Sequence, residues 1–154
     1  MKTKFSLIGG LLLLALFATA CGGQAGAAGS DVTPAASEGG AVEGYASLVD
    51  ALRVAGATVE SGDEVEQAFF AVMGQIIKVN GADVQVFEYE TAEAMEADAA
   101  QVAEDGGSIG TSMVAWMATP HFYKAGRILV LYVGDDQAIL DLLESALDPQ
   151  FAGR

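Results

Sequence analysis

One serine of the chain lies in a pattern that many hydrolases use for their nucleophile. Residues 106–110 match G-x-S-x-G around Ser108, and His121, the only histidine, follows further along. In those hydrolases the serine occupies a sharp turn between a preceding strand and a following helix. Here the expected order is reversed, because a predicted helix precedes Ser108 and a strand follows it. We therefore predict a loop at this position and no enzyme, with a weak hydrolase built on Ser108 and His121 kept as an alternative.

The chain offers hard oxygen ligands for metals but very few softer ones. With a single histidine and a single cysteine, Cys21, it lacks the ligand set of an ordinary zinc site. Acidic clusters occur at D-E-x-E (63–66), E-x-x-E-x-D (93–98) and D-D (135–136). None of them has the spacing of an EF-hand loop. The sequence therefore predicts no metal site and no cofactor, and it leaves open whether an acidic cluster binds Ca²⁺.

Aromatic and methionine side chains are the candidates for a binding surface. Trp116 occurs with Met113 and Met117, and Phe87 occurs with Tyr89, at the spacing of residues in strands. Such residues are more often part of a core than of a ligand groove. We nevertheless take these five side chains as the candidate patch for a ligand or a protein partner.

The only cysteine follows an export signal. Lys2 and Lys4 precede an apolar run over residues 5–20, whose last three residues are small and lead directly into Cys21. This is the arrangement of a secretory signal peptide, and the run is too short for a membrane-spanning helix. The segment A-T-A-C (18–21) resembles a bacterial lipobox. That resemblance implies a diacylglyceryl thioether on Cys21 and fatty acid, such as palmitate, on its amino group; the alternative is an ordinary cleaved signal.

Removal of residues 1–20 would leave a strongly acidic chain. It would have 21 acidic and 5 basic residues, a formal charge of −16. Such a balance argues against binding to nucleic acid and against docking on anionic lipid head groups. It favours solubility, cationic partners or divalent ions.

The mature chain divides into a linker and one domain. Residues 22–44 are almost all Gly, Ala, Ser, Pro and a few acids, which is the composition of a flexible linker. Residues 45–153 have the length of a single domain with one core. We therefore predict a signal peptide over 1–20, a lipidated cysteine with its linker over 21–44, and one domain over 45–153.

The first part of this domain carries one helical pattern and little else that is regular. Apolar residues at helical spacing predict a helix over 46–55. A brief strand is expected over 57–60, and the S-G-D-E segment at 61–64 is typical of a turn. Residues 65–73 are apolar but favour neither a strand nor irregular structure.

A hairpin is the clearest local prediction. Strands over 75–79 and 83–89 flank Asn80-Gly81, the pair that best tolerates the positive φ angles of a type I′ turn. Thr91 then occupies the N-cap position of a second helix, which we expect to end at Gly106-Gly107.

A second hairpin and a third helix complete the predicted domain. One strand is expected over 111–118 with a continuation through 121–124, and its partner over 127–133. Pro120 lacks an N–H group and should mark a bulge, a bend or a sheet edge. Asp135 is expected to cap the third helix, which has an apolar stripe and ends at D-P (148–149).

These elements predict an α+β fold. It comprises an antiparallel sheet of about four to five strands, built from two ββα units with helices packed on the sheet and a short extra N-terminal helix. The strand over 127–133 is apolar on both faces. We expect the second and third helices to cover one face and the first helix to be too small for the other. Part of that second face should then stay open as an apolar groove or patch.

Two segments of the domain resemble those of small bacterial lipoproteins that have no assigned activity. They are VNGxxVxVFEY (79–89) and HFYKAGRILVLYVGD (121–135). The resemblance implies an anchored domain on the extracytoplasmic side of a cell membrane or envelope, and it assigns no functional residues. We expect a non-enzymatic module that binds a protein, a small ligand or a second copy of itself. The alternative is a structural or accessory subunit of an envelope complex.

Overall fold

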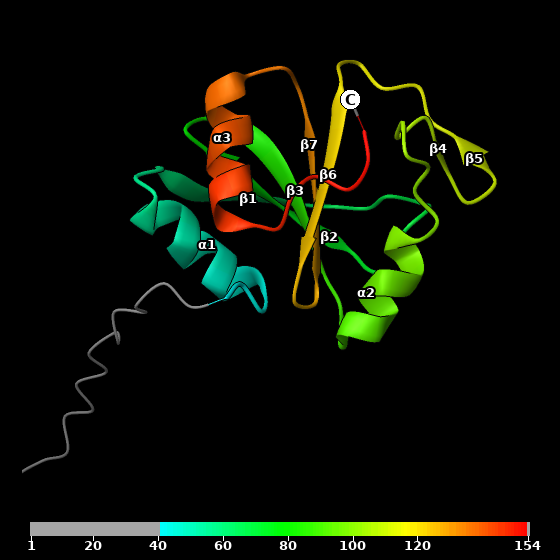
Figure 1. Cartoon of the computed structure of the whole chain (residues 1–154), viewed down its shortest axis with the longest axis horizontal. Coiled ribbons are helices and arrows are strands. Elements are labelled where there is room, and N and C mark those ends of the chain that lie inside the picture. Colours follow the sequence, from blue (N-terminus) through cyan, green and yellow to red (C-terminus); the bar gives the residue numbers. More distant parts are fainter. Residues whose placement is uncertain (1–40, 154) are drawn as a thin grey trace, which may run out of the picture. The chain divides into compact units, whose positions relative to one another are not determined.

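The computed structural model describes residues 41–153, so the predicted signal peptide, Cys21 and most of the predicted linker lie outside the described residues. Five antiparallel strands form the main sheet in the order β1-β2-β3-β7-β6, and β4 and β5 form a separate two-stranded sheet (Figure 1). The α+β architecture with one helix before the sheet confirms the predicted fold class. In chain order the elements are α1 (Tyr45–Val54), β1 (Val59–Val65), β2 (Gly74–Val79), β3 (Ala82–Glu88), α2 (Ala92–Ala99), β4 (Ser108–Ile109), β5 (Ser112–Met113), β6 (Pro120–Ala125), β7 (Ile128–Val133) and α3 (Gln137–Ala146).

The β2–β3 hairpin is confirmed at its predicted turn. Asn80 has a φ of 51° and Gly81 a φ of 91°, the positive values that a type I′ turn requires. Val79 pairs with Ala82 across the turn. The side chain of Asn80 also accepts a hydrogen bond of 2.8 Å from the backbone N–H of Thr58, which ties the turn to the segment before β1.

The expected turn at 61–64 is wrong, because this segment belongs to strand β1. The pairing with β2 shifts register between Ser61 and Glu64, so the residues between them form a bulge. An edge strand tolerates such a bulge because the backbone groups left unpaired can reach water.

The predicted strand over 111–118 is also largely wrong. Only Ser112–Met113 pairs there, with β4, while residues 114–119 form no ladder. The edge strand β6 begins at Pro120, where the missing N–H group removes no bond within the sheet.

The three predicted helices are present, with shifted ends. Helix α2 is capped by Thr91 as expected, since its Oγ1 accepts from the N–H of Ala94 at 3.2 Å, but the helix already ends at Ala99. The chain beyond it turns into a bridge between Val102 and Ile109, which the helical pattern did not indicate. The cap of α3 is Asp136 rather than Asp135.

The helices cover the two faces of the sheet differently from the prediction. Helices α1 and α3 lie together on one face, which we call the helical face, whereas α2 lies on the other (Figure 1). That other face, which we call the mixed face, is also covered by residues 66–73, the β4–β5 hairpin and the C-terminal residues 150–153. The expectation that the second and third helices share one face is therefore wrong.

The predicted opening on the second face is absent over the interior strand β7. Leu129 and Leu131 point to the mixed face and are fully buried, because Phe70 from the 66–73 segment and Ile109 from β4 pack in the same cluster. The prediction underestimated the cover of this face because it considered only helices as covering elements.

The domain begins slightly before the predicted boundary. Val42 is buried against the helical-face core, and the carbonyl of Glu43 accepts the N–H of Arg127 at 3.1 Å. The last residues assigned to the linker are thus part of the domain. Within 41–153, no helix combines the length and the apolar character needed to cross a membrane.

Candidate functional site

The five residues of the predicted patch separate into two groups. Phe87 and Tyr89 lie in the core of the mixed face, with exposed fractions of 0% and 2%. Met113 and Met117 are almost wholly exposed, at 91% and 102%. Trp116 is half-buried and lies between the two methionines in the sequence. Met113, Trp116 and Met117 all belong to the segment 113–117, which we take as the candidate surface and call the methionine surface.

Trp116 fixes the methionine surface to the domain. Its indole Nε1 donates a hydrogen bond of 2.7 Å to the carbonyl of Gly106. Its ring meets Phe69 and Phe122 edge-on, with centroids 6.2 and 5.9 Å apart. Buried tryptophans need such a partner for the N–H group, and edge-to-face contacts add to the packing. The sequence prediction missed Phe69 and the Gly106 carbonyl, since neither has a local signal.

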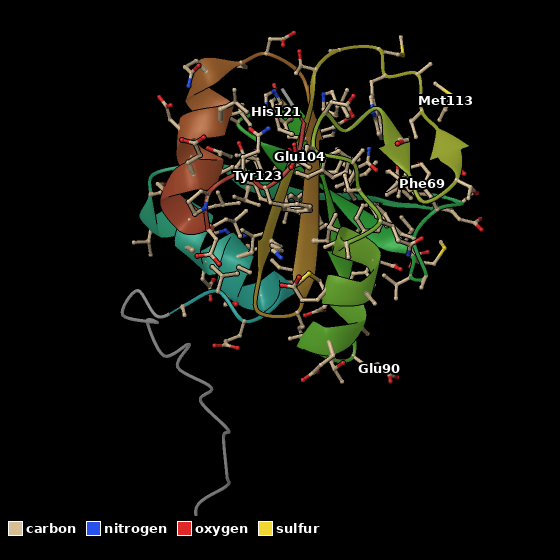
Figure 2. All side chains as sticks on the ribbon, turned by 45° about the vertical axis from the view of Figure 1, so that its right-hand side comes forward. Phe69, Glu90, Glu104, Met113, His121 and Tyr123 are labelled. Carbon is tan, nitrogen blue, oxygen red and sulfur yellow. The ribbon has the colours of Figure 1, made fainter. Side chains whose placement is uncertain are left out.

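The β4–β5 hairpin carries Met113 to the outside of the domain. Ile109 in β4 is buried in the mixed-face core, and the N–H of Gly110 donates to the carbonyl of Gln101 at 2.8 Å. Ser108 pairs with Met113 across the hairpin. Figure 2 shows Met113 at the periphery of the molecule, with Phe69 on the same side and closer to the sheet. One residue of the hairpin is thus an anchor and another is free for contact.

Tyr89 is part of a polar contact that closes the mixed face. Its hydroxyl donates to Asp98 at 2.9 Å, and the same carboxylate accepts the N–H of Ala71 at 2.7 Å and the amide of Gln101 at 3.0 Å. Burial raises the pKa of Tyr89 well above its ordinary range, and the hydrogen bond and charge of Asp98 act in the same direction. Asp98 therefore holds α2, β3 and the 66–73 segment together.

Four of the eight carboxylates in the acidic clusters are engaged in structural contacts. Glu96 forms an ion pair of 2.6 Å with Lys124, and Asp98 is committed to Tyr89. Asp136 caps α3, while Asp135 accepts the hydroxyl of Thr119 at 2.5 Å. Among residues 41–153, no three His, Cys, Asp or Glu side chains are grouped so that they could hold a metal ion.

Ser108 and His121 are not brought together. Ser108 lies in β4, which covers the mixed face. His121 is on the helical face, where its ring stacks on Tyr132 with centroids 6.1 Å apart and its Nδ1 lies 2.9 Å from Oε1 of Gln150. The Gln150 amide nitrogen donates to the carbonyl of Ala152, which orients Oε1 as the acceptor from Nδ1–H. The geometry that a serine–histidine hydrolase requires is absent here.

Each basic side chain of the described domain forms an ion pair or a hydrogen bond. Residues 41–153 contain nineteen acidic and four basic residues. Lys78, Lys124 and Arg127 form ion pairs with Asp83, Glu96 and Glu88, and Arg53 donates to the carbonyl of Val59 at 3.2 Å. The hydrogen bond and charge of Asp83 raise the pKa of Lys78. Within the described domain, the surface is thus acidic with no free basic patch.

Two shallow hollows flank Tyr45 at the start of α1, away from the methionine surface. One, of about 290 Å³, lies between α1 and β1 and is lined by Val49 and Arg53 among others. The second, of about 260 Å³, includes Met73 and Glu88. Sites for small molecules usually measure roughly 300–1,000 Å³, so each hollow is at or below the lower limit. No sequence pattern indicated these hollows, because Tyr45 fitted the apolar stripe of a helix.

No protein-family model, curated protein or solved structure matches this chain. The structure is an α+β domain with a sheet covered on both faces, strongly acidic, and with two almost wholly exposed methionines that flank Trp116 in the sequence. The methionine surface is therefore the basis on which a function can be proposed.

Proposed function

We propose that this chain is a lipid-anchored, extracytoplasmic, non-enzymatic module that binds a protein partner through the methionine surface. The observation that carries the proposal is the contrast between Trp116, held by the Gly106 carbonyl, and the neighbouring Met113 and Met117, which are almost wholly exposed. Apolar side chains presented on a fixed base mark contact sites, and methionine adapts its shape to a partner more easily than branched residues do.

A protein partner fits this surface better than a small molecule. Met113 lies at the periphery of the molecule, in a two-stranded hairpin, and is 91% exposed (Figure 2). A small ligand needs a concave site that buries most of its surface. A protein can instead supply the concave side of the contact.

The charge of the domain defines the partner further. With nineteen acidic against four basic residues in 41–153, a second copy would meet strong like-charge repulsion. A partner with an apolar centre and a basic rim would be attracted to the same surface. We therefore propose an envelope protein of that character rather than a homodimer.

Anchoring at Cys21 is supported by the sequence around it. The only cysteine follows a basic, apolar and small-residue signal, and two or more acyl chains are enough for stable membrane attachment. In the domain itself, α1 begins at the lower side and runs to the left, whereas the β4–β5 hairpin lies at the upper right (Figure 1). The methionine surface is thus distant from the point where the chain leaves the domain toward Cys21.

Mass spectrometry of the membrane fraction tests the anchor. We expect a mature chain that begins at Cys21 and carries lipid, and we expect Cys21→Ser to abolish the modification. A chain released to the medium with a free Cys21 thiol would contradict the proposal, as would a different mature N-terminus.

Site-specific photo-crosslinking in intact cells tests the docking surface. A crosslinking residue at exposed Ser112, beside Met113, should capture one envelope protein, and Met113→Asp with Met117→Asp should abolish that product. The matched control is a crosslinker at Val54, which is 72% exposed on α1 at the other side of the sheet.

Three outcomes would contradict docking by the methionine surface. Equal capture from Val54 would mean that contact is not localised, and capture of a second copy would favour a homodimer. Stoichiometric co-purification that survives both aspartate substitutions would favour the alternative, an accessory subunit held through another face.

A further inference from the structure

The methionines of the described domain lie in sharply different environments. Met95 in α2 is 2% exposed within the mixed-face core, and Met73 is 55% exposed. Met113 and Met117 are 91% and 102% exposed. Their thioethers are thus open to any small oxidant in the surrounding solution.

Oxidation of a thioether requires direct contact with the oxidant. With a peroxide, a sulfur lone pair attacks one oxygen, the O–O bond breaks and an S–O bond forms. The sulfur loses two electrons to the peroxide, whose second oxygen takes up a proton and leaves as water or an alcohol. The product is methionine sulfoxide, which reductases specific for each epimer return to the thioether.

The surroundings of these two side chains allow oxidation without unfolding. Trp116 is held through Nε1 by the Gly106 carbonyl, and Ile109 holds the hairpin in the core, so neither anchor depends on a methionine. A sulfoxide at Met113 or Met117 would remain in water. At Met95 the same polar group would be buried among apolar side chains and would destabilise the core.

We propose that Met113 and Met117 form a reversible oxidation site for peroxides, and that their oxidation switches off docking at the methionine surface. The proposed loss of docking rests on the proposed function, since it adds regulation to that same surface. Two polar sulfoxides would replace the apolar centre of the contact while the fold persists.

The test treats the full chain in membranes with hydrogen peroxide and follows each methionine by peptide mass mapping. The exposed fractions of Met113 and Met117 exceed that of Met95 by more than tenfold. We expect their initial rates of oxygen uptake to differ by a factor of about ten or more, because susceptibility follows exposure. Oxidation of Met95 at a similar rate would overturn the proposed site.

Enzymatic reduction separates reversible oxidation from other damage. When peroxide is applied and removed before irradiation, the crosslink from Ser112 should disappear, and reduction of both sulfoxides by the two epimer-specific reductases should restore it. Persistence of the crosslink after both methionines are oxidised would overturn the switch. Absence of any crosslink before treatment would instead contradict the proposed function, and the mass map would still decide the oxidation site.

Discussion

The two faces of the sheet are closed in different ways. The helical face is covered by α1 and α3, whose fully buried side chains are leucines and isoleucines such as Leu48, Leu52 and Leu143. The mixed face is covered by one short helix, the β4–β5 hairpin and two irregular segments. Its cover includes aromatic rings and side-chain hydrogen bonds to the backbone, as at Trp116 and Asp98.

This difference follows from backbone hydrogen bonding. A helix satisfies its own N–H and C=O groups, so it can close a face through apolar contact alone. Irregular segments leave backbone groups unpaired, and side chains such as Asp98, which accepts the N–H of Ala71, must satisfy them. The irregular cover also carries loops outward, and it is there that Met113 and Met117 are exposed.

The largest effect is expected in the helical face. Leu143→Ala removes a fully buried side chain from α3 and should lower the free energy of unfolding by about 2–5 kcal/mol. Chemical denaturation measures this loss, and Leu140→Ala, at a half-buried position on the same helix, is the control. Equal losses at both positions would show that this face does not depend on tight packing.

A smaller and more local effect is expected in the mixed face. Asp98→Ala leaves the hydroxyl of Tyr89 and the N–H of Ala71 without their acceptor, which should cost about 1–3 kcal/mol. Amide hydrogen exchange should accelerate chiefly over 66–73. Asp98→Asn keeps one acceptor oxygen and should lose less. Unchanged exchange over 66–73 in Asp98→Ala would disprove the closing role of this carboxylate.

Two tyrosines should respond with opposite signs to loss of the hydroxyl. The hydroxyl of Tyr123, buried on the helical face, has no hydrogen-bond partner among the described residues, whereas that of Tyr89 donates to Asp98. Tyr123→Phe should therefore raise the free energy of unfolding by up to about 1 kcal/mol, while Tyr89→Phe should lower it by a similar amount. Thermal unfolding at neutral pH measures both changes in the free energy of unfolding. Changes of the same sign in the two variants would contradict this prediction.

The raised pKa of Tyr123 predicts how the free energy of unfolding depends on pH in the alkaline range. Burial, with a smaller effect of Glu144, raises the pKa of Tyr123 from 10.0 to about 12. Between these values the unfolded chain has lost a proton that the folded chain keeps, so the free energy of unfolding falls as pH rises. Tyr123→Phe should reduce this slope without removing it, because the pKa of Tyr89 is raised as well. An unchanged slope in denaturation series above pH 10 would contradict this.

The smallest effect is expected at the methionine surface. Met113→Ser and Met117→Ser alter almost wholly exposed side chains, and each should change the free energy of unfolding by no more than about 0.5 kcal/mol. Chemical denaturation checks this. A larger loss would mean that these methionines pack against the domain.

Sequence patterns correctly predicted the features that depend only on residues close together in the sequence. The turn at Asn80-Gly81, the cap at Thr91 and the apolar stripe of α3 each depend on residues within a few positions of one another, and the structure bears them out. The end of α2 at Ala99 could not be predicted, because the bridge between Val102 and Ile109 that follows it has no such signal. The bulge in β1 depends in the same way on the register with β2.

The sequence by itself determined the acidic character of the chain, the position of its only cysteine directly after an apolar stretch, and the alternation of side chains along each strand. Only the tertiary structure decided which of two similar apolar groups is buried. Phe87 and Tyr89 lie beneath segments distant in sequence, whereas Met113 and Met117 have no such cover. Periodicity states the side of a strand to which a residue points, but its depth depends on what packs above it, and that is set by contacts between distant segments.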